Sequence, residues 1–236
     1  MAFFKPCGTH SVYSLNEVGG VTGVVVLGED HNDYTIRTSG LAGTIDHGKI
    51  GDLGLFGFTG ANASGQGLAL VAANDVGDYF MAELDGSGRF RDLGYDAAGN
   101  SPTLGKQNSS GVAVGYEWID SNPKPNGTSI YGFIYQPGVG VTNVGYLGGA
   151  EVYRFNAIND LGWIVGSGIT GEGNGALMMW IPGEEAITLI ESNTTVGTPH
   201  DVNNVGAVIG EFGFRAFHWY DGVVTPVGRR YVEDPS

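Results

Sequence analysis

The sequence predicts an all-β protein, specifically a five-bladed β-propeller of four-stranded blades, and two observations lead to this prediction. Glycine accounts for 42 of the 236 residues, while charged residues make up only 15%. This composition favours short strands joined by tight turns over helices. The second observation is an Asn-x-x-Gly motif that recurs about every 45 residues. Its asparagines are Asn16, Asn62, Asn108, Asn159 and Asn203.

Each unit shows the same order of features, and a strand precedes its motif. An apolar strand follows the turn, and a small residue stands seven positions after the asparagine in every unit: Gly23, Ala69, Gly115, Gly166 and Gly210. A loop of variable length, a second apolar stretch, a glycine turn and a last strand complete the unit. The predicted glycine turns end at Gly48, Gly86, Gly138, Gly183 and Gly222. Asparagine and glycine accept the positive φ that tight hairpin turns need, which explains this punctuation.

Five such units predict one domain that spans residues 1–236. A four-stranded unit cannot bury both of its faces alone, and radial stacking lets each unit cover its neighbour, as in a β-propeller. A stacked β-solenoid is the alternative, although solenoid coils are usually shorter than these repeats. Residues 3–8 (FFKPCG) resemble residues 224–228 (VTPVG). We therefore expect the N-terminal segment to close the ring by joining the final blade.

A family resemblance supports the same architecture. The stretches INDLGWIVG (158–166), RAFHWYDG (215–222) and RDLG (91–94) resemble the HAF-repeat family, which is named for a His-Ala-Phe triplet. Arg215 takes the place of the histidine in the last unit, and the other units lack the triplet. The resemblance runs from about residue 10 to residue 228. It implies a propeller-like repeat protein with an extracellular or periplasmic location, and it implies no catalytic residues.

Charge and composition exclude some classes of partner. Lys and Arg number 11 against 25 Asp and Glu, which gives a net charge of −14. Nucleic acids and anionic membranes are therefore unexpected partners, because phosphate binding needs a basic surface. No apolar run approaches the roughly 18 residues of a membrane span, and the N-terminus shows no signal peptide. The single cysteine, Cys7, rules out an internal disulfide. The oligomeric state stays open.

One column of the repeat is the first candidate site. The position three residues before the motif asparagine varies in chemistry, whereas a purely structural column should hold similar residues. Its members are Tyr13, Thr59, Gly105, Asn156 and His200, with His10, Arg154 and Asp201 nearby. In a propeller the first strand of each blade lines the channel, so these groups would meet at the channel mouth. They could bind a polar small molecule or hold ordered water in a wet channel.

Two loops between the second and third strands form the other candidates. The third loop, 116–129, contains Trp118 beside Glu117, and a tryptophan next to polar groups suits stacking on a sugar ring. A tryptophan that folds back over the blade edge is the alternative. The first loop, 27–40, holds Asp30, His31 and Asp33, which could bind a divalent cation such as calcium. Solvated carboxylates explain that cluster equally, and no other cofactor is expected.

Three functions remain open at this point. A binding module for a small polar ligand, carbohydrate above all, fits the mixed column and the Trp118 loop. An enzyme, a lyase, hydrolase or cyclase, would use His200, Tyr13 and His10 as proton donors or acceptors, with Asp30 or Asp201 to orient them. A scaffold protein without a small ligand is the third. The chain contains no GxSxG, HExxH or P-loop motif.

Overall fold

The structure is a computed structural model. It describes side chains at residues 57–71, 80–85, 87, 89–95, 102–119, 130–191, 197–213 and 215–228. It describes the backbone alone at residues 10–15, 21–27, 33–40, 43–49, 55–56, 72, 79 and 96. Statements about side chains below refer to the first set.

Five antiparallel sheets follow one another along the chain, and strands that are consecutive in sequence are neighbours in each sheet. The first sheet contains β1 (His10–Leu15), β2 (Val21–Leu27), β3 (Asp33–Gly40) and β4 (Gly43–Lys49). The second contains β5 (Leu55–Phe58), β6 (Gly67–Ala72), β7 (Tyr79–Leu84) and β8 (Phe90–Asp96). The third contains β9 (Thr103–Gln107), β10 (Ala113–Trp118), β11 (Ile130–Gln136) and β12 (Gly140–Val144).

The last two sheets complete this order. The fourth contains β13 (Tyr146–Leu147), β14 (Ala150–Ile158), β15 (Ile164–Ile169), β16 (Gly175–Trp180) and β17 (Ile187–Glu191). The fifth contains β18 (Gly197–Val202), β19 (Val208–Phe212), β20 (Arg215–Tyr220) and β21 (Val223–Pro226). The predicted all-β class is confirmed, and so are the antiparallel sheets. No helix among the described residues is long and apolar enough to cross a membrane.

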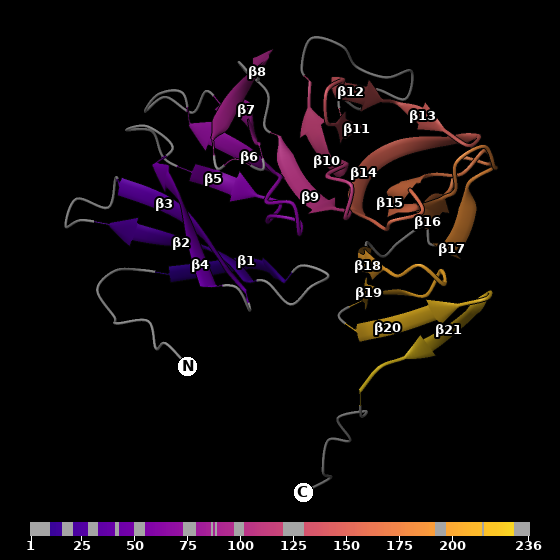
Figure 1. The fold of residues 1–236 in the computed structure, drawn as a ribbon. Helices are drawn as coiled ribbons and strands as arrows, with labels where there is room; N and C mark the ends of the chain where they lie inside the picture. Colours follow the sequence, from indigo (N-terminus) through magenta and orange to yellow (C-terminus); the bar gives the residue numbers. More distant parts are fainter. Residues whose placement is uncertain are drawn as a thin grey trace, which may run out of the picture.

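The sheets lie side by side in an arc, with the first and last sheets at its two ends (Figure 1). In each of the last three sheets one strand packs against the sheet before it: β9, the first of the third sheet, β14, the second of the fourth, and β18, the first of the fifth. Thus β9 contacts β5 and β6, β14 contacts β9, β10 and β11, and β18 contacts β14, β15 and β16. These three strands lie on the inner side of the arc (Figure 1).

Hydrophobic cores fill the space between neighbouring sheets. Leu177 and Met179 of the fourth sheet share one cluster with Phe217 and Trp219 of the fifth. Leu68 and Met81 of the second sheet join Phe133 of the third in another. Alternate residues of each strand supply these contacts, as expected for a sheet with apolar neighbours on both faces.

The motif asparagine fixes its own turn in four units. In the fourth unit the side-chain oxygen of Asn159 accepts hydrogen bonds from the backbone N–H groups of Leu161, at 3.0 Å, and Trp163, at 2.8 Å. Asn62, Asn108 and Asn203 accept bonds from the equivalent backbone groups of their own turns. The motif glycines Gly65, Gly111, Gly162 and Gly206 have the expected positive φ, whereas the asparagines of these units do not. The asparagine therefore acts through these hydrogen bonds.

Three units depart from the predicted strand boundaries. In the third unit β10 extends to Trp118, so residues 116–118 of the expected loop 116–129 belong to a strand. In the first unit we expected a loop over 27–40 and a turn at Gly48, but β3 occupies Asp33–Gly40 and Gly48 lies inside β4. Instead β3 ends at Gly40 and β4 begins at Gly43, and these two glycines are paired, so the chain reverses direction between them. The fourth unit has a fifth strand, β13. Gly148 (φ 58°) and Gly149 (φ 79°) form a two-residue turn between β13 and β14, so the two strands pair antiparallel.

The proposed closing segment, residues 3–8, lies outside the described residues, as does the motif asparagine of the first unit, Asn16.

Candidate functional site

The variable column before the motif asparagine coincides with a β-bulge. Tyr13 is the extra residue in the register of β1 with β2, and His200 is the extra residue in that of β18 with β19. Asn156 is one of two extra residues in the register of β14 with β15, the other being Tyr153. In the third unit two residues, Gly105 and Lys106, lie between the pairs on either side of the register shift. A bulge leaves a residue outside the ladder and re-aims its side chain, and bulges are frequent beside active sites.

The bulges of three units meet on the inner side of the arc. The backbone of Gly105 approaches that of Asn156 so closely that a Cβ at Gly105 would lie 2.5 Å from the Asn156 carbonyl oxygen. Lys106 Nζ donates to Asp201 Oδ2 at 2.7 Å, which joins the third unit to the fifth. His200 precedes Asp201 on β18. We name Lys106, Asn156, His200 and Asp201 the central cluster.

The central cluster is polar and accessible. The side chains of Lys106 and Asp201 are 50% and 46% exposed, His200 is exposed and Asn156 is half-buried. In the part of the chain that the structure describes, the side chains of Asn156 and His200 make no hydrogen bond. One cation, one anion, an amide and an imidazole are thus offered to solvent together. Such a set of donors and acceptors suits an uncharged or zwitterionic polar molecule.

A second group adjoins the cluster along β14. The guanidinium carbon of Arg154 lies 4.9 Å from the centre of the Tyr116 ring, a cation–π contact between the fourth and third sheets. Trp118 stands two residues beyond Tyr116 on β10, so the two side chains lie on the same face of the strand. Trp118 is 47% exposed. Arg154 lies two residues before Asn156 on β14, and Trp118 lies at the end of β10 in the neighbouring sheet.

The structure separates Trp118 from its neighbour Glu117. Successive residues of a strand point to opposite faces, and Glu117 is fully buried while Trp118 is exposed. The two residues therefore do not form the single sugar subsite that the sequence suggested.

The buried carboxyl of Glu117 has no hydrogen-bond partner with normal geometry among the described residues. Burial raises the pKa of Glu117, and the Tyr95 hydroxyl and the Asn143 amide lower it by a smaller amount. Tyr95 belongs to β8 and Asn143 to β12, so this polar group lies where the second sheet packs against the third. Burial also raises the pKa of Tyr95, with the nearby Glu117 adding to the shift.

Thr59 differs from the other members of its column. Its hydroxyl accepts a hydrogen bond from the Leu68 backbone N–H at 3.0 Å and donates to the Gln107 side chain at 3.0 Å. The residue is buried, and the register shift in its unit falls at Phe56 instead. Thr59 therefore ties the second unit to the third and is not available to a ligand.

The residues expected to catalyse proton transfer are only partly described. The Asp201 carboxylate accepts bonds from Lys106 and from the Val202 backbone N–H, so Lys106 takes the place at Asp201 that the enzyme hypothesis gave to His200. The side chains of His10 and Tyr13 lie outside the described residues, although both residues are on β1.

The predicted metal ligands are also outside the described side chains. Asp30 and His31 are not described, and only the backbone of Asp33, at the start of β3, is placed. The described residues contain no group of three or more potential metal ligands.

Sequence reasoning missed Lys106 and Tyr116. Lys106 directly follows a member of the variable column, and lysines and arginines are few in this chain. That scarcity was a usable signal, but the Asp201 partner could be found only once the curvature of the arc was known.

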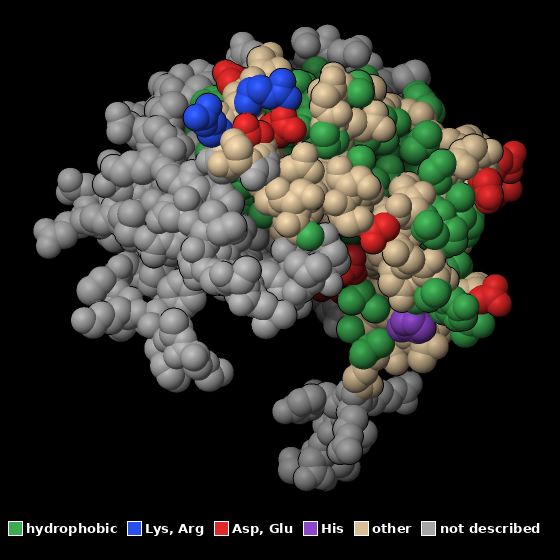
Figure 2. Space-filling model, in the orientation of Figure 1, with side chains coloured by type: hydrophobic (Ala, Val, Ile, Leu, Met, Phe, Trp, Pro, Cys, Tyr) green, Lys and Arg blue, Asp and Glu red, His purple; other side chains and the backbone are tan. Residues whose placement is uncertain are grey.

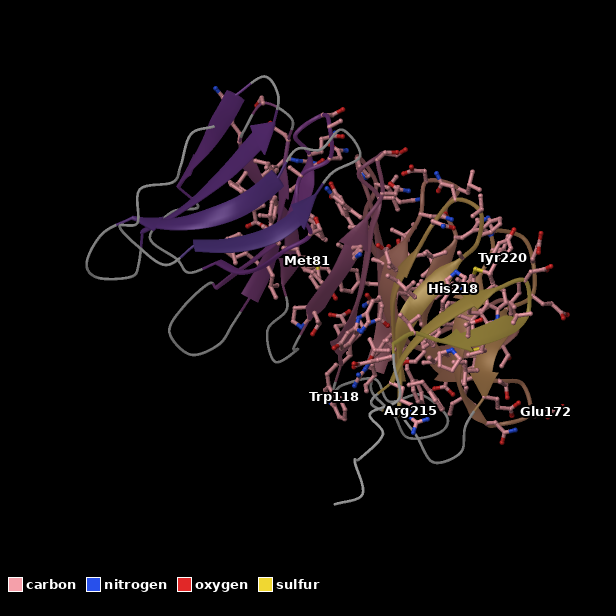
Figure 3. The ribbon with its side chains drawn as sticks, turned by 90° about the horizontal axis from the view of Figure 1, so that it is seen from below. Met81, Trp118, Glu172, Arg215, His218 and Tyr220 are labelled. Atoms are coloured by element: carbon pink, nitrogen blue, oxygen red, sulfur yellow. The ribbon has the colours of Figure 1, made fainter. Side chains whose placement is uncertain are left out.

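Described residues beside the β10–β11, β15–β16 and β19–β20 connections lie along one side of the molecule (Figure 3). Figure 3 places Trp118 of the third unit, Glu172 of the fourth and Arg215 of the fifth along the same edge, with His218 and Tyr220 away from it.

No family model matches the chain, and a search of curated proteins found no match. The HAF-repeat resemblance therefore remains a prediction from the sequence.

Proposed function

We propose that this protein is a binding module for a small polar ligand, with carbohydrate as the first class to test, and that the central cluster is its site. One observation carries the proposal: bulges at the same position of the repeat gather Lys106, Asn156, His200 and Asp201 from three units. The repeat supplies a rigid scaffold, and the positions that break the repeat supply the chemistry.

Carbohydrate suits this surface for two reasons. Sugar hydroxyls both donate and accept hydrogen bonds, and the cluster offers an amide, an imidazole, an ammonium and a carboxylate. Trp118 adds an exposed aromatic side chain on the same face of β10 as Tyr116, and an aromatic ring can cover the apolar face of a sugar. Because each unit contributes a different residue, we expect one asymmetric site and not five equal ones.

The same proposal includes a closed five-bladed ring. Six positions after the motif asparagine, Leu68, Val114 and Val165 are 0% exposed because the next unit covers them, whereas Ile209 of the fifth unit is 51% exposed. Figure 2 shows hydrophobic side chains at the surface around the fifth sheet, at the lower right of the view. The first sheet lies at the other end of the arc (Figure 1) and would cover this face in a closed ring.

Closure would also complete the site. Tyr13 is the bulged residue of β1, and a closed ring brings β1 beside β18 in the way that β18 lies beside β14. The tyrosine would then join His200 and Asp201 at the same rim.

The test is a thermal-shift screen of the full chain against mono- and oligosaccharides, followed by calorimetry on each hit. A ligand that binds the folded state raises the melting temperature by mass action. We expect a hit to weaken at least tenfold in Asn156→Ala and in His200→Ala. His218→Ala is the matched histidine control, because His218 lies in β20 outside the cluster.

The alternative functions are distinguished in the same experiment. If Asn156→Ala and His200→Ala bind a sugar as tightly as the wild type does, the site is not the central cluster. If Trp118→Ala also binds it as tightly, the site is not at Trp118 either. The absence of any hit in the panel would favour the scaffold hypothesis. Release of a product from a bound sugar would favour the enzyme hypothesis.

A further inference from the structure

A cavity lies between the fourth and fifth sheets, and none of the residues of the central cluster lines it. Its volume is about 360 Å³, at the lower end of the range for small-molecule sites. Leu189 and Ile190 of β17 form one wall, and residues of β19, β20 and β21 form the other. The apolar residues of that second wall are Phe212, Ala216, Phe217, Val224 and Pro226.

Among the described residues that line this cavity, Arg215 is the only charged one. It is the first residue of β20, it is exposed, and within the described part of the chain its guanidinium has neither a hydrogen bond nor an ion pair. The nearby carboxylate of Glu191, at the end of β17, is bonded instead to the Asn174 side chain. A cation without a partner beside an apolar cavity is a place where an anionic group can be bound.

The sequence repeat marks Arg215 as exceptional. Arg215 lies two residues before Phe217, the residue that pairs with Gly210. The equivalent positions in the registers of the other units hold Thr35, Phe80, Tyr131 and Ala176. The fifth unit alone carries a charge there. The repeated scaffold does not need an arginine at this position, because four units are built without one.

We propose that this cavity binds a small amphipathic carboxylate, with its hydrocarbon part between Leu189, Phe217 and Val224 and its carboxylate on Arg215. The guanidinium fork matches a carboxylate in a bidentate pair. The apolar walls match a short alkyl or aryl chain, which gains free energy by leaving water. The chain as a whole carries a net charge of −14, so it disfavours non-specific binding of anions.

This site is independent of the proposed sugar site, since the two share no residue. Either can fail without affecting the other.

The test uses octanoate as the probe and isothermal titration calorimetry on the full chain, with octanol as the uncharged analogue. We expect octanoate to bind and Arg215→Gln to weaken it about tenfold, the usual scale for a hydrogen-bonded charge. Octanol should bind wild type and Arg215→Gln alike. Val224→Trp should abolish binding of both probes, because the larger side chain fills the cavity.

Two controls keep the outcome interpretable. Arg89→Gln removes the same charge from an exposed arginine of the second unit, and it should leave octanoate binding unchanged. Circular dichroism should show that every variant is folded. The proposal is overturned if octanoate does not bind the wild type. It is also overturned if Arg215→Gln and Val224→Trp bind octanoate as tightly as the wild type does.

Discussion

The side-chain amide of Asn159 donates a hydrogen bond to the backbone carbonyl of Asn203, at 2.9 Å, and so joins the turn of the fourth unit to that of the fifth. The same contact recurs from Asn108 to the carbonyl of Asn159, at 3.1 Å, and from Asn62 to the carbonyl of Ser109, at 2.9 Å. The motif asparagine therefore does two things at once. Its oxygen shapes its own turn, and its amide holds the next unit.

Substitutions at Asn159 should separate these two roles. Asn159→Asp keeps the oxygens that accept the turn bonds but removes the amide donor, so we expect a loss of about 1–2 kcal/mol in unfolding free energy. Asn159→Ala removes both and leaves the Leu161 and Trp163 backbone N–H groups without their acceptor, for a loss of about 3 kcal/mol. Urea denaturation of both variants measures the difference. An Asn159→Asp variant as stable as wild type would show that the bond between units contributes nothing, whereas equal losses in the two variants would show that the turn bonds contribute nothing.

Ring closure makes a prediction about Asn203, whose amide has no partner within the described residues. In a closed ring it would donate to the turn of the first unit, as Asn159 donates to that of the fifth. Asn203→Asp should then cost as much as Asn159→Asp. In an open arc the aspartate would cost less than about 0.5 kcal/mol, as for most exposed substitutions.

Ile209 provides an independent check of closure. If the first sheet covers Ile209, Ile209→Ala should destabilise the protein by about 2–4 kcal/mol. Val165→Ala is the reference for a position that the next unit covers. A loss at Ile209 well below that at Val165 would contradict the closed ring.

Much of the fold could be predicted from the sequence because the repeat is punctuated by residues with a local physical role. Asn159 and its equivalents identify the turns, and the apolar stretches between them identify the strands. The first unit was predicted less well, since Gly48 resembled a turn glycine while the strand pair turned earlier, between Gly40 and Gly43. Local signals could not decide between these glycines.

The candidate site was only half visible in the sequence. The variable column with Asn156 and His200 stood out, but its cause, a shared β-bulge, depends on strand register and not on residue type. The bond between Lys106 and Asp201 joins residues of the third and fifth units, so it depends on how the sheets curve. Glu117 was grouped with Trp118 by proximity in sequence, and the alternation of side chains along β10 separates them.

The buried carboxyl of Glu117 should make the stability of the protein depend on pH. Burial raises its folded-state pKa above the ordinary value of 4.5, so the folded protein holds this proton more tightly than the unfolded chain does. Its contribution to stability is therefore complete below about pH 4.5 and is lost as the pH rises through the folded-state pKa. Glu117→Gln is neutral at every pH, so we expect it to exceed wild type by about 1–2 kcal/mol at pH 8.

The Glu117→Gln advantage should shrink as the pH is lowered, because wild type then becomes neutral at this position too. Thermal or urea unfolding from pH 4 to pH 8 measures the trend. Glu211→Gln, an exposed glutamate of β19, is the control and should follow wild type throughout. An advantage that is constant with pH would show that Glu117 does not titrate differently in the folded state.

Gly105 should be required for the central cluster because its backbone lies against that of Asn156. In Gly105→Ala the new Cβ would come within 2.5 Å of the Asn156 carbonyl oxygen and 3.0 Å of that of Val114. Both atoms belong to backbone, so β9 must move away from β14, at a cost of about 1–3 kcal/mol. Gly57→Ala is the matched control, since its Cβ would make only ordinary contacts of 3.6–3.8 Å with Leu104 and Leu70.

Calorimetry should therefore show that Gly105→Ala is less stable than Gly57→Ala. Any sugar that binds the wild type should bind Gly105→Ala more weakly and should bind Gly57→Ala with unchanged affinity. Equal stability of the two variants would mean that the third and fourth units do not meet at their bulges, and the central cluster would lose its geometric basis.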